Sequence, residues 1–120
     1  MANKNEAKVK FTADTKEFTE EINKSGQEIS KLRSELRLNA TQMKNNGTSV
    51  EGLAKKKKLL TKELEAQRNK TQALEAKLKS AKEIYGENST EVTKLTTQLN
   101  NSKKAEMNLE KEASNTNKEL

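Results

Sequence analysis

The side chains in this sequence that are best suited to binding chemistry are four consecutive lysines, Lys55 to Lys58. Ammonium groups in such a run neutralise phosphate charge and release counterions. Lys55, Lys56 and Lys58 are therefore candidate phosphate contacts. Acidic residues flank the run, and no aromatic residues are interleaved with it for base stacking. A solvated helix face is the simpler interpretation, and we do not expect nucleic acid to be the main partner.

The sequence offers little for catalysis. It contains no cysteine and no histidine, which removes thiol nucleophiles, imidazole bases, disulfides and nearly every kind of zinc site. Its acidic residues are spread along the chain among lysines, as with Glu75 and Lys79, which lie one helical turn apart. Glu106 alone falls in the expected core seam, where we interpret it as part of a hydrated polar layer. We therefore expect no enzyme, no metal and no cofactor.

The elements that position these side chains follow from a repeat of seven residues. Hydrophobic residues make up 30% of the chain and aromatic residues 2%, which is too little for a thick globular core. With Ile22 at position a and Phe18 at position d, one heptad frame runs to Leu120 without a break, as expected for helices that pack through a narrow seam. Thirteen large apolar residues at these positions form the predicted core seam: Phe18, Ile22, Ile29, Leu32, Leu36, Leu53, Leu60, Leu64, Leu74, Leu78, Leu95, Leu99 and Leu109.

Start and stop signals divide this frame into helices. A capping residue followed three positions later by glutamate marks each of the three predicted helix starts, at Asp14–Glu17, Thr48–Glu51 and Asn88–Glu91. Gly47 and Gly86 suit the positive φ that often follows a helix end. The sequence contains no proline. These signals predict helices over about 15–45, 49–85 and 89–120, which together form one helical domain over residues 14–120.

Residues 1–13 are expected to be a tail and a short extended arm. Apolar and polar residues alternate from Lys8 to Ala13, with Val9, Phe11 and Ala13 on one face. Alternation of this kind predicts a strand. A single strand is not stable alone, so we expect either a free arm or a strand that a partner completes.

The two glycine stops leave two arrangements open. If the chain folds back at both, polar seam residues meet each other, with Thr71 against Ser102 and Gln67 against Glu106, while Leu36 meets Leu60. Grouped polar residues cost less than polar residues set against apolar ones. We therefore predict an all-α, antiparallel three-helix coiled-coil bundle made of helical hairpins. The alternative is an elongated parallel coiled-coil oligomer formed by self-association.

From Phe18 to Leu120, four large apolar residues fall outside positions a and d: Leu38, Leu59, Ile84 and Met107. We expect them on the outer face of the bundle, as candidate contacts with a partner. No stretch is apolar enough for a signal peptide or a membrane span.

Three segments carry a family resemblance: Val9–Phe18, Ile29–Leu38 and Ala81–Val92. Together they resemble the N-terminal region of tape measure proteins from long-tailed phages and prophages of Gram-positive bacteria. The resemblance covers roughly residues 8–112. Its most specific part is Tyr85-Gly86-Glu87-Asn88-Ser89, whereas the helical remainder is shared with many coiled coils.

The resemblance implies a structural, non-enzymatic role. Proteins of this family fill the lumen of the tail tube, set tail length through their own length and bind tail assembly chaperones. It implies tail tube and chaperone proteins as partners, and the bacterial host cytoplasm during assembly and then the virion tail as locations. Because the family's chains are far longer, we expect an N-terminal piece or the remnant of a decayed prophage gene. The alternatives are a free-standing coiled-coil adaptor and a basic coiled coil associated with nucleic acid.

Overall fold

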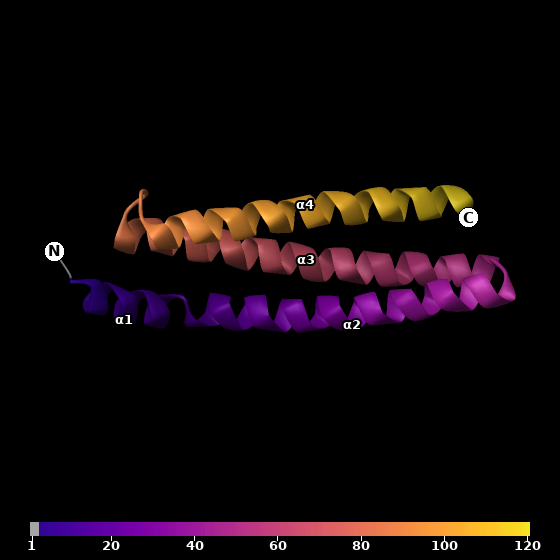
Figure 1. Ribbon diagram of the computed structural model, residues 1–120, viewed down its shortest axis with the longest axis horizontal. Helices are drawn as coiled ribbons and strands as arrows, with labels where there is room; N and C mark the ends of the chain where they lie inside the picture. The colour runs from indigo at the N-terminus through magenta and orange to yellow at the C-terminus, as the bar shows by residue number, and fades with distance from the viewer. Residues whose placement is uncertain (1–2) are drawn as a thin grey trace.

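Four helices account for almost all of the chain. The structure is a computed structural model that describes residues 3–120 (Figure 1). Its elements are α1 (Lys4–Asp14), α2 (Lys16–Asn46), α3 (Val50–Tyr85) and α4 (Thr90–Glu119). Residues 3–120 contain no strand. The predicted all-α class is therefore confirmed.

The three long helices lie side by side, with α3 in the middle (Figure 1). The chain turns back after α2 and again after α3, so that α2 and α4 are both antiparallel to α3. Both pack on α3 and not on each other. The Cα positions extend over 63 × 20 × 16 Å. The predicted antiparallel hairpins are confirmed, and the elongated parallel alternative is not the arrangement that the chain adopts.

Two glycines make the turns possible. Gly47 has φ 85° and ψ 154°, and Gly86 has φ 92° and ψ 156°. These angles belong to a region of backbone conformation that is essentially restricted to glycine. Both predicted helix stops are therefore confirmed, although neither glycine has the ψ value of the left-handed helical conformation.

Serine side chains cap the helices that follow the turns. Ser49 Oγ accepts a hydrogen bond from the Gly52 amide at 3.0 Å, and Ser89 Oγ accepts one from the Val92 amide at 3.2 Å. Each bond satisfies an amide that the first helical turn leaves without a partner. The caps lie one residue later than the predicted Thr48 and Asn88.

The heptad seam forms the core in all three long helices. Phe18, Ile22 and Leu36 are half-buried, and the other predicted seam residues are buried. One apolar cluster, near the α3–α4 turn, contains Leu74, Leu78, Ala81, Val92, Leu95 and Leu99. A second, farther from that turn, contains Leu60, Leu64 and Leu109, with Leu36 and Ala113 packed against it. The predicted contact between Leu36 and Leu60 falls in this second cluster.

The middle helix buries a wider face than the seam alone. In addition to the a and d positions, α3 buries Leu59, Ala66 and Ala73, which recur every seven residues at position c. A helix that packs against neighbours on two sides needs two apolar faces, so it buries more of its surface than positions a and d alone provide. This arrangement explains why Leu59, expected on the outer face, is only 5% exposed.

The predicted extended arm is wrong, because residues 4–14 form helix α1. Asn3 Oδ1 accepts a hydrogen bond from the Glu6 amide at 2.9 Å and so caps this helix. The helical conformation places Ala7 and Phe11, four residues apart, on one face toward α3, whereas Val9 is 70% exposed. No neighbouring strand is available in residues 3–120, so a strand here leaves its backbone unpaired.

Asp14 is not the cap of the first long helix. It is the last residue of α1, and Thr15 separates α1 from α2 with φ −108° and ψ 9°. The Thr15 side chain is buried, and its hydroxyl donates to the Phe11 carbonyl oxygen at 2.6 Å. Thr15 is the N-cap residue of α2, but its side chain stabilises the end of α1 and makes no capping hydrogen bond to α2.

Candidate functional site

A buried polar layer lies between the two apolar clusters, where α3 meets α4. Gln67 Nε2 donates to Ser102 Oγ at 2.7 Å, and Thr71 Oγ1 lies 2.7 Å from the same oxygen. Thr71 Oγ1 also lies 2.6 Å from Glu106 Oε2. A hydroxyl has one proton to donate. The bonds therefore form one connected network, in which Gln67 donates to Ser102, and Thr71 lies within hydrogen-bond distance of Ser102, of Glu106 and of the Gln67 carbonyl oxygen at 2.9 Å.

An arginine completes this layer at its exposed end. Arg68 Nε lies 3.7 Å from Glu106 Oε1, and the same guanidinium reaches Glu110 Oε1 at 3.1 Å. The Glu106 side chain is 18% exposed, so its charge keeps partial contact with water. A fully satisfied polar layer fixes the register of two helices, because any slip leaves buried groups without partners.

The sequence predicted the composition of this layer and one of its pairs. Thr71 meets Ser102, as predicted. Gln67 bonds to Ser102 and not to Glu106, which accepts from Thr71 instead. The polar residues therefore pair diagonally between neighbouring layers. Long side chains reach the next layer easily, which pairing by heptad position does not take into account.

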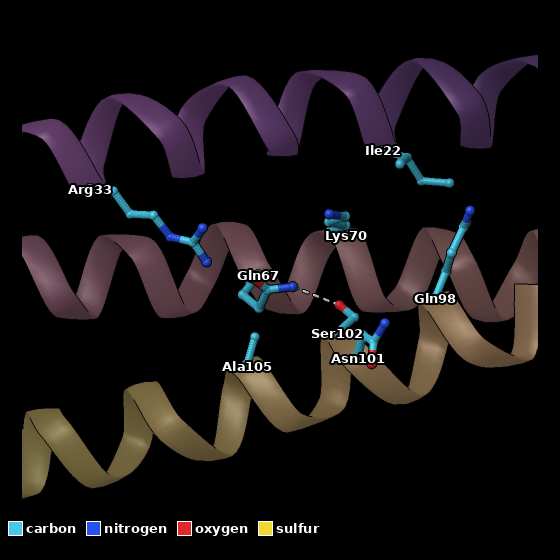
Figure 2. Close-up of a pocket in the computed structure, with 8 residues that line it drawn as sticks. All are labelled: Ile22, Arg33, Gln67, Lys70, Gln98, Asn101, Ser102 and Ala105. Carbon is cyan, nitrogen blue, oxygen red and sulfur yellow. Dashed lines mark hydrogen bonds between the residues drawn. The ribbon is translucent and has the colours of Figure 1, made fainter.

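Beside the polar layer, a groove runs between α2 and α4 (Figure 2). It is lined by Ile22, Arg33, Gln67, Lys70, Gln98, Asn101, Ser102 and Ala105. The lining carries amide, hydroxyl and cationic groups and no carboxylate, so it is polar, with a positive balance of charge. Residues 3–120 contain no cluster of three or more histidine, cysteine or acidic side chains that could hold a metal ion.

One buried carboxylate stands near this groove on α3. The Glu63 side chain is 4% exposed, and its Oε2 lies 3.3 Å from Arg33 Nε on α2. Burial raises the pKa of Glu63 above its ordinary value, because it removes water from the charged form. Arg33 opposes this effect through its hydrogen bond and its charge without cancelling it, and the negative charge of Glu112 adds to the rise. The pair joins α2 to α3 in register.

The lysine run does not form one patch. Lys55 and Lys58 are exposed, whereas Lys56 and Lys57 are half-buried. Lys57 Nζ donates to Asn117 Oδ1 on α4 at 2.6 Å. Successive residues of a helix point in different directions, so four adjacent lysines cannot share one face. Only Lys55 and Lys58 of the candidate phosphate contacts are fully available to solvent.

The four apolar residues outside the seam have different environments. Leu38 is 56% exposed and Met107 69% exposed, so both remain available for partner contact. Ile84 is half-buried in a hollow that α1 and the α3–α4 turn line together. Leu59 is buried in the core of this chain and is not available, which corrects its expected place on the outer surface.

The contact between α1 and the end of α3 was not predicted from the sequence. The rings of Phe11 and Tyr85 meet edge to face with their centroids 5.3 Å apart. Lys77 Nζ lies 5.7 Å from the centroid of the Phe11 ring, within the range of a cation–π interaction. These are two of the three aromatic residues in the chain. The small number of aromatic residues could have indicated this contact, since large aromatic side chains in a polar sequence tend to lie at packing sites.

The fold and these contacts define an all-α helical bundle. Comparisons of the sequence with models of known families, with curated proteins and with solved structures found no match. In residues 3–120, no helix combines the length and the apolar character needed to cross a membrane.

Proposed function

We propose that this chain is a helical structural module of a phage tail tape measure protein, with a role in tail length determination and tail assembly. It acts through protein contacts made by helix faces, and it does so first in the bacterial host cytoplasm and then in the virion tail. Its partners are tail tube and tail assembly chaperone proteins. The polar layer sets the register of the module and is not a reaction centre.

One observation carries this proposal. Two of the three segments that resemble tape measure proteins, Val9–Phe18 and Ala81–Val92, come together at one end of the bundle through Phe11 and Tyr85. They are separated by more than sixty residues in the sequence. Because of this contact, the two segments belong to one structural unit, which consists of α1 and the α3–α4 turn. If the helices were separate, the two segments would not be in contact.

The surface available to a partner is small and discontinuous. Leu38 lies on α2 and Met107 on α4, and both are more than half exposed. Exposed apolar side chains of this kind serve as anchors when a partner provides a pocket for them. A second basic or catalytic surface is not proposed, because the structure divides the lysine run and buries the reactive hydroxyls of the polar layer.

The proposal is tested by co-expression with tail tube and tail assembly chaperone proteins of a long-tailed phage, followed by capture through a tag on this chain. We expect capture by at least one of them, and a loss of about tenfold in affinity for the double substitution Leu38→Lys and Met107→Lys. Val50→Lys is the matched control, because Val50 is 71% exposed and lies outside the candidate surface.

Two results would count against the proposal. Failure of the unaltered chain to capture any tail protein removes the assembly role. Capture that is unchanged by the double substitution, with helicity intact, removes Leu38 and Met107 as the contact surface and leaves the role itself standing.

A further inference from the structure

The turn between α2 and α3 begins with an asparagine followed by a glycine. Asn46 is the last residue of α2 and is exposed, and Gly47 carries the backbone out of the helix with φ 85°. Nothing lies within 4 Å of the position that a Cβ of Gly47 would occupy. The peptide bond between these two residues is therefore open to solvent and free of steric cover.

The backbone amide of Gly47 differs from its counterpart in the other turn. Gly86 N donates to the Lys82 carbonyl oxygen at 3.0 Å, which extends the hydrogen bonding of α3 by one residue. The described residues provide no acceptor for Gly47 N, either on the backbone or on a side chain. Rotation of the peptide that follows Asn46 consequently breaks no hydrogen bond.

We infer that Asn46 is a site of spontaneous chemical modification, by deamidation through a cyclic imide. The Gly47 nitrogen attacks Cγ of Asn46, and a bond forms between these atoms. The bond from Cγ to Nδ2 breaks, and the side-chain nitrogen leaves as ammonia with the proton from Gly47 N. One water molecule then opens the imide at either carbonyl carbon. The products are aspartate or isoaspartate at position 46.

The structure distinguishes Asn46 from Asn39, Asn88 and Asn101. Asn39 is buried, and its Nδ2 donates to the Gly52 carbonyl oxygen at 3.1 Å. Asn88 lies in the second turn, but the amide that follows it, Ser89 N, donates to the Gly86 carbonyl oxygen at 3.2 Å. Asn101 lies inside α4, where the next amide belongs to the helix. A free amide in place of a bonded one accelerates attack about fivefold, and the absence of a side chain at Gly47 adds to this.

The modification has a structural consequence. It places a carboxylate at the C-terminal end of α2, where the helix dipole disfavours negative charge. Isoaspartate also adds one methylene to the main chain at the turn. Met43 Cγ would lie only 2.9 Å from a Cβ on Gly52, so the hairpin is tightly packed just inside this turn. Both products therefore loosen the α2–α3 hairpin at its closed end.

The test is incubation of the purified full chain at physiological temperature and mildly alkaline pH, followed by peptide mass mapping. An isoaspartyl-specific methyltransferase labels the isoaspartate product independently. We expect Asn46 to deamidate at least fivefold faster than Asn88 or Asn101. Asn46→Gln is the matched control and should remove the labelled product, because a longer side chain must close a larger ring.

A second measurement distinguishes the effect of the folded backbone on the deamidation rate from the effect of the neighbouring residue in the sequence. In denaturant Ser89 loses its hydrogen bond, so Asn88 should react faster than in the folded chain, whereas Asn46 should change little. Asn46→Asp should lower the midpoint of thermal unfolding, and Asn69→Asp, an exposed position inside α3, should lower it less. Reaction of folded Asn46 no faster than that of Asn88, or reaction only after unfolding, overturns the inference.

Discussion

Removal of Ser102 from the polar layer should expose how strongly its members depend on one another. Ser102→Ala deletes the acceptor of Gln67 Nε2 and the hydroxyl that is hydrogen-bonded to Thr71 Oγ1. Gln67 is 3% exposed, so bulk water has little access to its amide. Leaving a buried polar group unpaired costs about 1–3 kcal/mol. We expect the free energy of unfolding to fall by that amount.

The companion substitution Gln67→Met should behave differently. It removes the buried amide itself, while Ser102 keeps its bond to Thr71, so we expect a loss of only about 0.5–1.5 kcal/mol. The double variant, with Ser102→Ala and Gln67→Met together, contains neither the Gln67 amide nor the Ser102 hydroxyl, so neither group can be left without a hydrogen-bond partner. Replacement of both partners by apolar groups of similar shape is often nearly neutral, so the double variant should be about as stable as the original chain.

The assay is urea unfolding followed by far-ultraviolet circular dichroism, from which the coupling free energy of the two substitutions is calculated. Thr97→Ala is the control, because the Thr97 hydroxyl is exposed and bonds only to the Thr93 carbonyl oxygen. It should change stability by less than about 0.5 kcal/mol. If the losses of the two single variants simply add in the double variant, Gln67 and Ser102 are not coupled and the hydrogen-bond network between them is refuted.

Three further outcomes follow from the packing, the buried acid and the turns. Leu60→Ala should cost roughly 2–5 kcal/mol in urea unfolding because Leu60 is fully buried, whereas exposed Leu38→Ala should cost less than about 0.5 kcal/mol; equal losses would contradict the assigned core. The raised pKa of Glu63 means that its folded form holds the proton more tightly, so its contribution to stability is full below pH 4.5 and is lost as pH rises through the folded value. Glu63→Gln should therefore stabilise the chain at neutral pH and lose that advantage in acid, and a difference independent of pH would refute this. Gly86→Ala should lower stability by about 1–3 kcal/mol at its positive φ, whereas Gly26→Ala in α2, where a Cβ meets nothing within 4 Å, should raise it by about 0.5–1 kcal/mol; a gain at both sites would mean that the turn does not require glycine.

The long helices were predictable because their signals are local and repeated. The heptad frame, the missing proline and the two glycines together determine where each helix runs and which face it buries. The observed starts of α3 and α4 differ from the predicted ones by about one residue, because Ser49 and Ser89 and the residue before each of them are all good capping residues. The side chain that reaches the free amide is decided by backbone angles that the sequence does not show.

The N-terminal helix was missed because two patterns overlap there. Alternation from Lys8 to Ala13 predicts a strand, yet Asn3 and Glu6 stand three residues apart in the same capping arrangement that marks the later helices. Tertiary packing decided between them, since only a helix brings Ala7 and Phe11 together against α3.

The buried Leu59 shows a different limit. A heptad pattern identifies the face that a helix buries against one neighbour, but it does not say that a helix has two neighbours. The available signal was position c of the middle helix, where Leu59, Ala66 and Ala73 are apolar and the other helices mostly carry lysine or asparagine.

Three long helices laid antiparallel place the start of α1 and the end of α4 at opposite ends of the long axis (Figure 1). An even number of such helices would have brought them back to the same end. Tension applied between the termini therefore acts parallel to the interfaces between α2 and α3 and between α3 and α4. The interlocked layers of each interface resist sliding together, whereas a load across a hairpin opening would separate them one at a time. We therefore expect the bundle to unfold at a higher force under an axial pull than under a pull that opens one of its hairpins.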